Sequence, residues 1–188
     1  MKADLKIKFL QSFNKYYTNS NNARQINLLV LSTIIIAIIG ILPAIALPSY
    51  LSQVNIKAAQ AEARQTLTAM NAAQQAYYLR NNQFLTNMAD FQKFSGVSIK
   101  TATVNYTYDV VSIGGVWGVV HLAKPALRSQ LFGYAGGVSK IQTPGTTKYT
   151  TATVLCESKF PGYQPSQASI SFSSTEIKCS VADFLDVK

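Results

Sequence analysis

An uncharged apolar run constrains this chain more than any other feature of its sequence. Residues 28–47 contain no charged side chain, and as a helix rising about 1.5 Å per residue they match the roughly 30 Å hydrocarbon core of a membrane. A secretory signal usually has a shorter apolar region followed by small residues, whereas this run continues into Pro48 and Tyr50. A soluble protein of this length is too small to surround such a helix. We therefore predict a transmembrane helix over 28–48.

Basic residues set the expected orientation of this helix. Most lysine and arginine residues near the run precede it, and only Lys57 and Arg64 follow it closely. Because positive residues are retained on the cytoplasmic side, the amino end should stay in the cytoplasm and the rest should be exported. The formal net charge of +9 is otherwise spread along the chain. That spread favours a solvated surface, so binding to nucleic acid is only a weak expectation.

Beyond Pro48 the apolar pattern becomes that of an amphipathic helix. Apolar residues recur at steps of three or four, so they line one side of a helix that should pack on another element. The helix should end near Arg80, where two asparagines favour turn conformations. Pro43 and Pro48 should interrupt it, since each removes one backbone hydrogen bond and bends the helix axis. The apolar stripe consists of Ile56, Ala59, Ala63, Leu67, Met70, Ala73 and Tyr77.

The remaining sequence predicts a connector followed by short strands. Residues 82–100 lack a sustained period, with one helical turn expected near 87–94. Apolar and polar residues then alternate over 101–111, and 114–123 should form the antiparallel partner strand. The segment 124–148 is rich in turn residues and indicates no particular element. One face of the first strand should carry Val104, Tyr106, Tyr108 and Val110, and further strand candidates are 149–158, 168–174 and 176–182.

The order of these elements predicts an α+β fold. A long N-terminal helix, half transmembrane and half amphipathic, should pack on a small, mostly antiparallel sheet in one compact domain. We assign 1–27 to a basic leader, 28–48 to the transmembrane helix, 49–80 to its amphipathic continuation and 81–188 to a β head.

Two cysteines, Cys156 and Cys179, lie on flanking strand candidates. In an exported domain an even pair indicates a disulfide, which would stabilise the fold by roughly 3 kcal/mol in the chain-entropy model. A metal site would need more ligands than the single histidine, His121, and this pair provide, so none is expected. His121 is interpreted as a surface or packing residue. Sparse acidic residues and the absence of a phosphate-binding loop favour a protein that is not an enzyme and carries no cofactor.

These features together resemble the type IV pilins and the related pseudopilins of type II secretion. The resemblance rests on the basic leader, the stretch "IIGILPAIALPSYL", the Ala/Gln-rich continuation and the C-terminal cysteine pair. The stretch "TAMNAAQQAYYLRNNQF" is especially similar to the cyanobacterial pilin-like proteins of the G/H type.

The resemblance implies a subunit of a pilus or secretion pseudopilus that serves motility, adhesion, DNA uptake or secretion. Such a subunit is a single-pass protein of the inner (plasma) membrane with its head outside, and it can enter a cell-surface filament. Its partners would be the membrane, other pilin or pseudopilin subunits and assembly platform proteins. Close helix packing in the assembly would involve Ala37, Gly40, Ala44 and Pro48.

The processing motif of that family is degenerate here. Prepilins carry glycine, phenylalanine and, four residues beyond it, glutamate, and aligning Gly40 and Pro48 places Ile26, Asn27 and Leu31 at those positions. Either the chain keeps its leader, or a tolerant prepilin peptidase still cleaves and methylates it. The alternative to a filament subunit is an unprocessed single-span protein whose pilin-like head binds or scaffolds another envelope component.

Overall fold

The computed structural model describes residues 20–94, 99–113, 117–143, 145–180 and 182–187. Within the helix that begins at Ser20, the side chains at 20–26, 28–29 and 38–49 lie outside this description. The chain forms two compact units, unit 1 at Met1–Gln53 and unit 2 at Val54–Lys188. The predicted leader falls largely on residues 1–19, outside the described residues.

A single helix, α2 (Ser20–Asn81), contributes to both units. It begins eight positions before the predicted start at Leu28, and it continues through Pro43 and Pro48 without interruption. A single helix that contains both prolines is what the sequence predicted, with one backbone hydrogen bond lost at each, and the predicted bend at these prolines stays a prediction. The predicted end is confirmed: Asn82 adopts a left-handed backbone with φ of 53°, and its N–H donates to the carbonyl of Tyr78 at 2.8 Å.

No helix in the described part of the chain is long and apolar enough to cross a membrane. The predicted span over 28–48 includes residues 38–48, whose side chains lie outside the description, and it stays a prediction.

Unit 2 contains a five-stranded antiparallel sheet in the order β1-β2-β3-β4-β7. The predicted hairpin of the first two strands is confirmed, and a second sheet pairs β5 with β6. A short helix, α3 (Met88–Phe94), forms at the predicted helical turn. The strands are β1 (Tyr106–Ile113), β2 (Gly118–Pro125), β3 (Phe132–Gln142), β4 (Tyr149–Pro161), β5 (Ile170–Phe172), β6 (Ile177–Cys179) and β7 (Phe184–Asp186), with a 3₁₀ turn at Gln167–Ser169.

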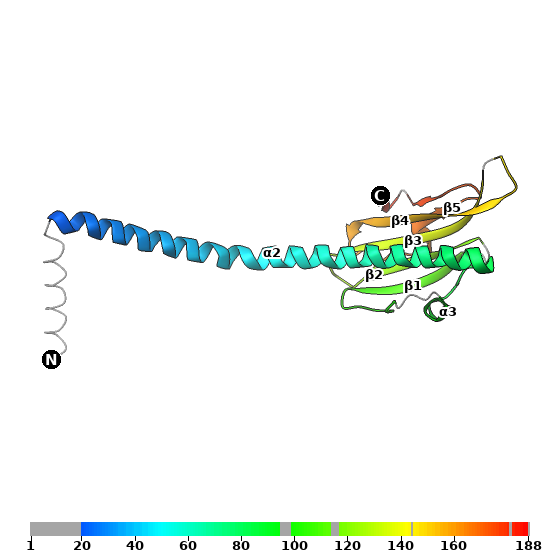
Figure 1. Ribbon diagram of the computed structural model, residues 1–188, viewed down its shortest axis with the longest axis horizontal. Helices are drawn as coiled ribbons and strands as arrows, with labels where there is room; N and C mark the ends of the chain where they lie inside the picture. Colours follow the sequence, from blue (N-terminus) through cyan, green and yellow to red (C-terminus); the bar gives the residue numbers. More distant parts are fainter. Residues whose placement is uncertain (1–19, 95–98, 114–116, 144, 181, 188) are drawn as a thin grey trace. The chain divides into compact units, whose positions relative to one another are not determined.

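The two faces of the large sheet are covered by different elements. In unit 2, α2 lies along one face, and the β5–β6 hairpin packs on the other (Figure 1). The predicted stripe of α2 is confirmed, because its five central members are buried and Ile56 and Tyr77 pack against the same core. On β1 the side chains of Tyr106, Tyr108 and Val110 join this core, whereas Val104 precedes the strand and is 94% exposed.

The central strand β3 lies in the segment that the sequence left without an element. Its glycines resemble turn residues, but the structure uses them for close approach. A Cβ on Gly136 would lie 2.8 Å from the side-chain oxygen of Asn71 on α2. A Cβ on Gly133 would collide with the backbone carbonyl of Tyr163. These glycines therefore keep the sheet close to its neighbours.

Candidate functional site

The residues predicted for processing and helix packing all lie on α2. Asn27, Leu31 and Ala37 have exposed side chains, and Leu31 is 59% exposed. The side chains predicted at Ile26, Gly40, Ala44 and Pro48 lie outside the description, so the structure does not test whether these residues pack together.

Large apolar side chains are exposed on the described part of α2 in unit 1. Five of them lie within the stretch 30–36, where each is about half exposed or more, and Tyr50 and Leu51 are exposed further along the helix. Soluble monomers rarely leave contiguous apolar surface uncovered, so this stretch has the character of an interaction surface. Its members are Val30, Leu31, Ile34, Ile35 and Ile36.

In unit 2 a buried asparagine joins α2 to two strands. The Asn71 side-chain amide donates to the carbonyl of Val154 on β4 at 3.1 Å. Its carbonyl oxygen lies 2.8 Å from Nδ1 of His121 on β2. The space for this side chain comes from Gly136, which lies opposite His121 in the β2–β3 register. We call Asn71, His121 and the Val154 carbonyl the polar clamp.

The polar clamp fixes the tautomer of His121. Because the Asn71 nitrogen donates to Val154, its oxygen must accept, and the proton of the neutral imidazole therefore resides on Nδ1. Nε2 is buried, and no described residue forms a hydrogen bond with it. The ring is fully buried beside Phe91, with centroids 5.5 Å apart. His121 is thus a packing residue, in agreement with one of the two interpretations of the sequence.

Burial lowers the pKa of His121 to about 3, because the imidazolium would lose its hydration. The unfolded chain, with an ordinary pKa near 6.5, binds a proton that the folded chain does not. Stability is therefore fully present above about pH 6.5 and falls as the pH decreases toward 3. Between pH 7 and pH 5 the free energy of unfolding should drop by roughly 2 kcal/mol, measured by urea unfolding at each pH.

The imidazole proton signal of His121 in an NMR titration provides the check on this prediction. The chain has one histidine, so the signal is unambiguous. It should keep its neutral position down to pH 4. A folded-state titration with a midpoint near pH 6.5 would contradict the burial argument.

Two further contacts hold α2 in place. The Gln74 side chain is fully buried and pairs with the backbone of Leu85, donating to its carbonyl at 2.6 Å and accepting from its N–H at 3.0 Å. The Arg64 guanidinium lies 3.6 Å from the carboxylate of Glu157 and 5.6 Å from the ring centroid of Tyr134. Asn71 and Gln74 were not predicted as site residues, and the only signal for them in the sequence is a polar side chain directly beside the apolar stripe.

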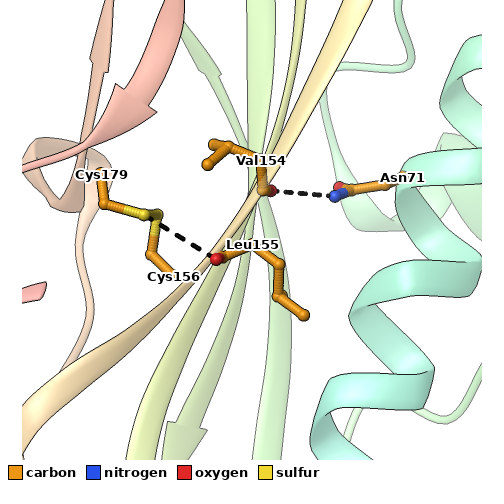
Figure 2. The surroundings of a disulfide bond; sticks show 5 residues. All are labelled: Asn71, Val154, Leu155, Cys156 and Cys179. Atoms are coloured by element: carbon orange, nitrogen blue, oxygen red, sulfur yellow. Dashed lines mark hydrogen bonds between the residues drawn. A yellow bond between two sulfur atoms is a disulfide. The ribbon is translucent and has the colours of Figure 1, made fainter. Parts of the chain in front are cut away.

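A disulfide joins Cys156 to Cys179, the pair predicted from the sequence. Cys156 lies on β4 and Cys179 ends β6, so the bond ties the β5–β6 hairpin to the large sheet. Figure 2 shows the disulfide and Asn71 on opposite sides of β4. This strand is therefore attached to the covering element on each face. Among the described residues, no group of three His, Cys, Asp or Glu side chains is placed to hold a metal ion.

Comparisons with known proteins give one family. The model of the type IV pilin-like G and H family matches residues 60–180, well over half of the chain. No curated protein and no solved structure matches the chain. The matched region runs from the amphipathic part of α2 through the disulfide, so it includes the polar clamp and both cysteines. The chain therefore belongs to the type IV pilin-like G and H family.

Proposed function

We propose that this protein is a structural, non-catalytic subunit of a type IV pilus or type II secretion pseudopilus. Residues 28–48 anchor it in the inner membrane, with the amino end in the cytoplasm and unit 2 outside. In the assembly, the apolar part of α2 packs against the same part of other pilin-like subunits, and assembly platform proteins drive the process.

The observation that carries this proposal is the exposed apolar stretch 30–36 on α2. Family membership supports it, because pilin-like proteins interact with other pilin subunits. An apolar helix surface needs lipid or other helices to cover it, and both are available to a membrane-anchored subunit that polymerises.

One observation favours a second candidate, an unprocessed single-span protein that scaffolds another envelope component. The expected cleavage position, between Ile26 and Asn27, lies inside α2, which begins at Ser20. Backbone that is hydrogen-bonded in a helix resists proteolysis better than an exposed loop does. A retained leader follows naturally from this arrangement.

The intact mass of the protein separates the two candidates. Protein from the cell envelope and from the sheared filament fraction should be measured side by side. A chain that begins at Asn27 and is recovered with filaments supports the filament subunit. A chain that retains Met1 and is absent from the filament fraction supports the scaffold.

Substitution at Leu31 tests the link between the degenerate motif and a retained leader. Leu31→Glu places a carboxylate near the cytoplasmic edge of the proposed span, where it should cost about 1–3 kcal/mol of insertion free energy. If the leader is retained, no new amine exists to offset this charge, so the membrane-bound amount should fall. Quantitative immunoblotting of membrane fractions measures the loss, and Leu31→Ile serves as the matched control.

The triple variant Ile26→Gly, Asn27→Phe, Leu31→Glu restores the processing motif and should behave differently. Cleavage would shorten it by the 26 leader residues, create the partner amine and raise its yield in sheared filaments. If the wild-type protein already has the shortened mass, the retained-leader argument fails.

A further inference from the structure

One edge of the large sheet is left open beyond β7. Strand β4 runs over Tyr149–Pro161, but β7 pairs with it only at Cys156, Glu157 and Ser158. The N–H of Val187 adds one bond to the carbonyl of Leu155 at 2.9 Å. No described strand pairs with this side of β4 over 149–154.

The direction of the backbone groups along this edge follows from the bonds that are made. The carbonyl of Leu155 and the N–H of Lys159 both point toward the β7 side. Backbone groups alternate in direction along a strand, so those of Tyr149, Thr151 and Thr153 also point outward. Proteins usually protect such an edge with charged residues or proline, and residues 149–154 contain neither.

A groove of about 560 Å³ lies at the β7 end of this open edge, between α2 and Ile177 of β6. Residues 153–155 of β4 line it, α2 lines one side with Arg64, Thr68 and Gln75, and Asp186 and Val187 line it at the end of β7. The groove thus begins where β7 ends and reaches the first open residues of β4, Thr153 and Val154. It offers backbone bonds and polar side chains, which suits an extended peptide strand more than a compact ligand.

The charges at the two ends of the open edge indicate which peptide strand would pair with it. Lys148 precedes the open edge and Asp186 lies at its other end, opposite Cys156. Both side chains are exposed, and no described residue forms an ion pair with either. An edge with one basic end and one acidic end is complementary to a second copy of itself in the reverse direction.

We propose that two copies of this protein pair through β4, antiparallel, about a two-fold axis at Thr151. In this register Thr151 faces Thr151 of the second copy and Tyr149 faces Thr153, which forms up to about six backbone hydrogen bonds. Lys148 of each copy then lies beside the end of β7 in the other copy, next to Asp186. The next position along the edge is already taken by Val187, so β7 limits the register.

This pairing differs from the packing of neighbours within one filament. In unit 2, α2 runs antiparallel to β4, because Arg64 contacts Glu157 while Gln75 contacts Thr151. A two-fold axis through the β4 edge therefore makes the unit 2 parts of the two α2 helices antiparallel. Filament neighbours under the proposed function have parallel helices. The β4 pairing would therefore join subunits of opposite orientation, such as those of two facing filaments. The statement that this pairing does not occur within one filament rests on the proposed function, whereas the pairing itself does not.

A zero-length carbodiimide cross-link tests the register. Equal amounts of ¹⁴N- and ¹⁵N-labelled full-length protein are mixed in detergent, cross-linked and digested. We expect a peptide pair joining Lys148 to Asp186 in mixed-isotope form. Within one chain these residues lie about 25 Å apart along the strand, too far for this reagent. A wild-type protein that stays monomeric at all concentrations, or mixed-isotope links that exclude this pair, would overturn the proposal.

Four variants and one control test the edge itself. Thr151→Pro removes an outward N–H and should abolish the dimer, whereas Thr151→Val keeps the N–H and should preserve it. Both substitutions remove the hydroxyl that accepts a hydrogen bond from the Gln75 amide at 3.2 Å, so the two variants lose the same side-chain bond and differ in the backbone N–H. Lys148→Asp and Asp186→Lys should each raise the dimer dissociation constant about three- to tenfold, and their combination should restore it.

Analytical ultracentrifugation in detergent gives the dissociation constants. Equal dimerisation of Thr151→Pro and wild type, or no recovery in the charge-swapped double variant, contradicts the proposal. Thr151→Pro should also leave the yield of sheared filaments unchanged, and a selective loss would place the edge inside the filament and overturn the antiparallel register. Absence of wild-type filaments would bear on the proposed function alone.

Discussion

Replacing Leu67 by alanine should lower the free energy of unfolding of unit 2 by about 3–4 kcal/mol. Leu67 is fully buried between α2 and the sheet, in the core that also contains Tyr106 and Tyr134. The shorter side chain loses apolar burial and leaves a cavity that a close-packed interior fills only in part. Urea unfolding of the full-length protein in detergent measures the change, with Trp117 as the sole tryptophan reporter.

Leu79→Ala is the matched control for this experiment. Leu79 lies on the same helix, and its substitution removes the same side-chain atoms, but Leu79 is 75% exposed. Its loss should change the free energy of unfolding by no more than about 0.5 kcal/mol. Equal effects of the two substitutions would mean that α2 does not pack on the sheet as described.

Removing the disulfide should lower the free energy of unfolding by about 3 kcal/mol. The double variant Cys156→Ala, Cys179→Ala frees a loop whose ends are 23 positions apart, and the unfolded chain gains the conformational entropy of that loop. Both cysteines are buried where the β5–β6 hairpin covers the sheet, so the hairpin should also lose protection from hydrogen exchange.

Chemical reduction gives an independent measure of the same quantity. A reducing agent should lower the free energy of unfolding of the wild-type protein by about as much as the double substitution does. The same agent should leave the free energy of unfolding of the double variant unchanged. Wild-type protein that is equally stable oxidised and reduced would show that the bond does not constrain the unfolded chain.

Local patterns in the sequence predicted the elements whose stabilising contacts follow a simple period. The apolar stripe of α2 was predictable because, in unit 2, α2 is exposed on one side and buried on the other. The β1–β2 hairpin was readable because its apolar residues alternate. Val104 continued that alternation by chance, since the strand begins only at Tyr106.

Other features depend on residues that are distant in the sequence and follow no local pattern. Gly136 has the local sequence pattern of a turn residue, and only its contact with Asn71, 65 positions earlier, explains why it is a glycine. The polar clamp likewise needs β2 and β4 to lie on either side of β3, and that strand order was not predictable. Strand β3 was therefore missed, and its neighbours were assigned correctly. For the exposed apolar stretch 30–36, the run was evident in the sequence, but the partners that we propose for it are other molecules, so this sequence does not predict the packing.

The polar clamp also has a mechanical consequence. Asn71 holds two strands at once, so α2 cannot slide along the sheet without breaking both hydrogen bonds together. A shift by one residue displaces a helix by about 1.5 Å, which is enough to break both. A pulling force applied to α2 from unit 1 is therefore carried into the centre of the sheet as a shear load. β4 bears part of that load, and the disulfide ties this strand to the β5–β6 hairpin on the other face.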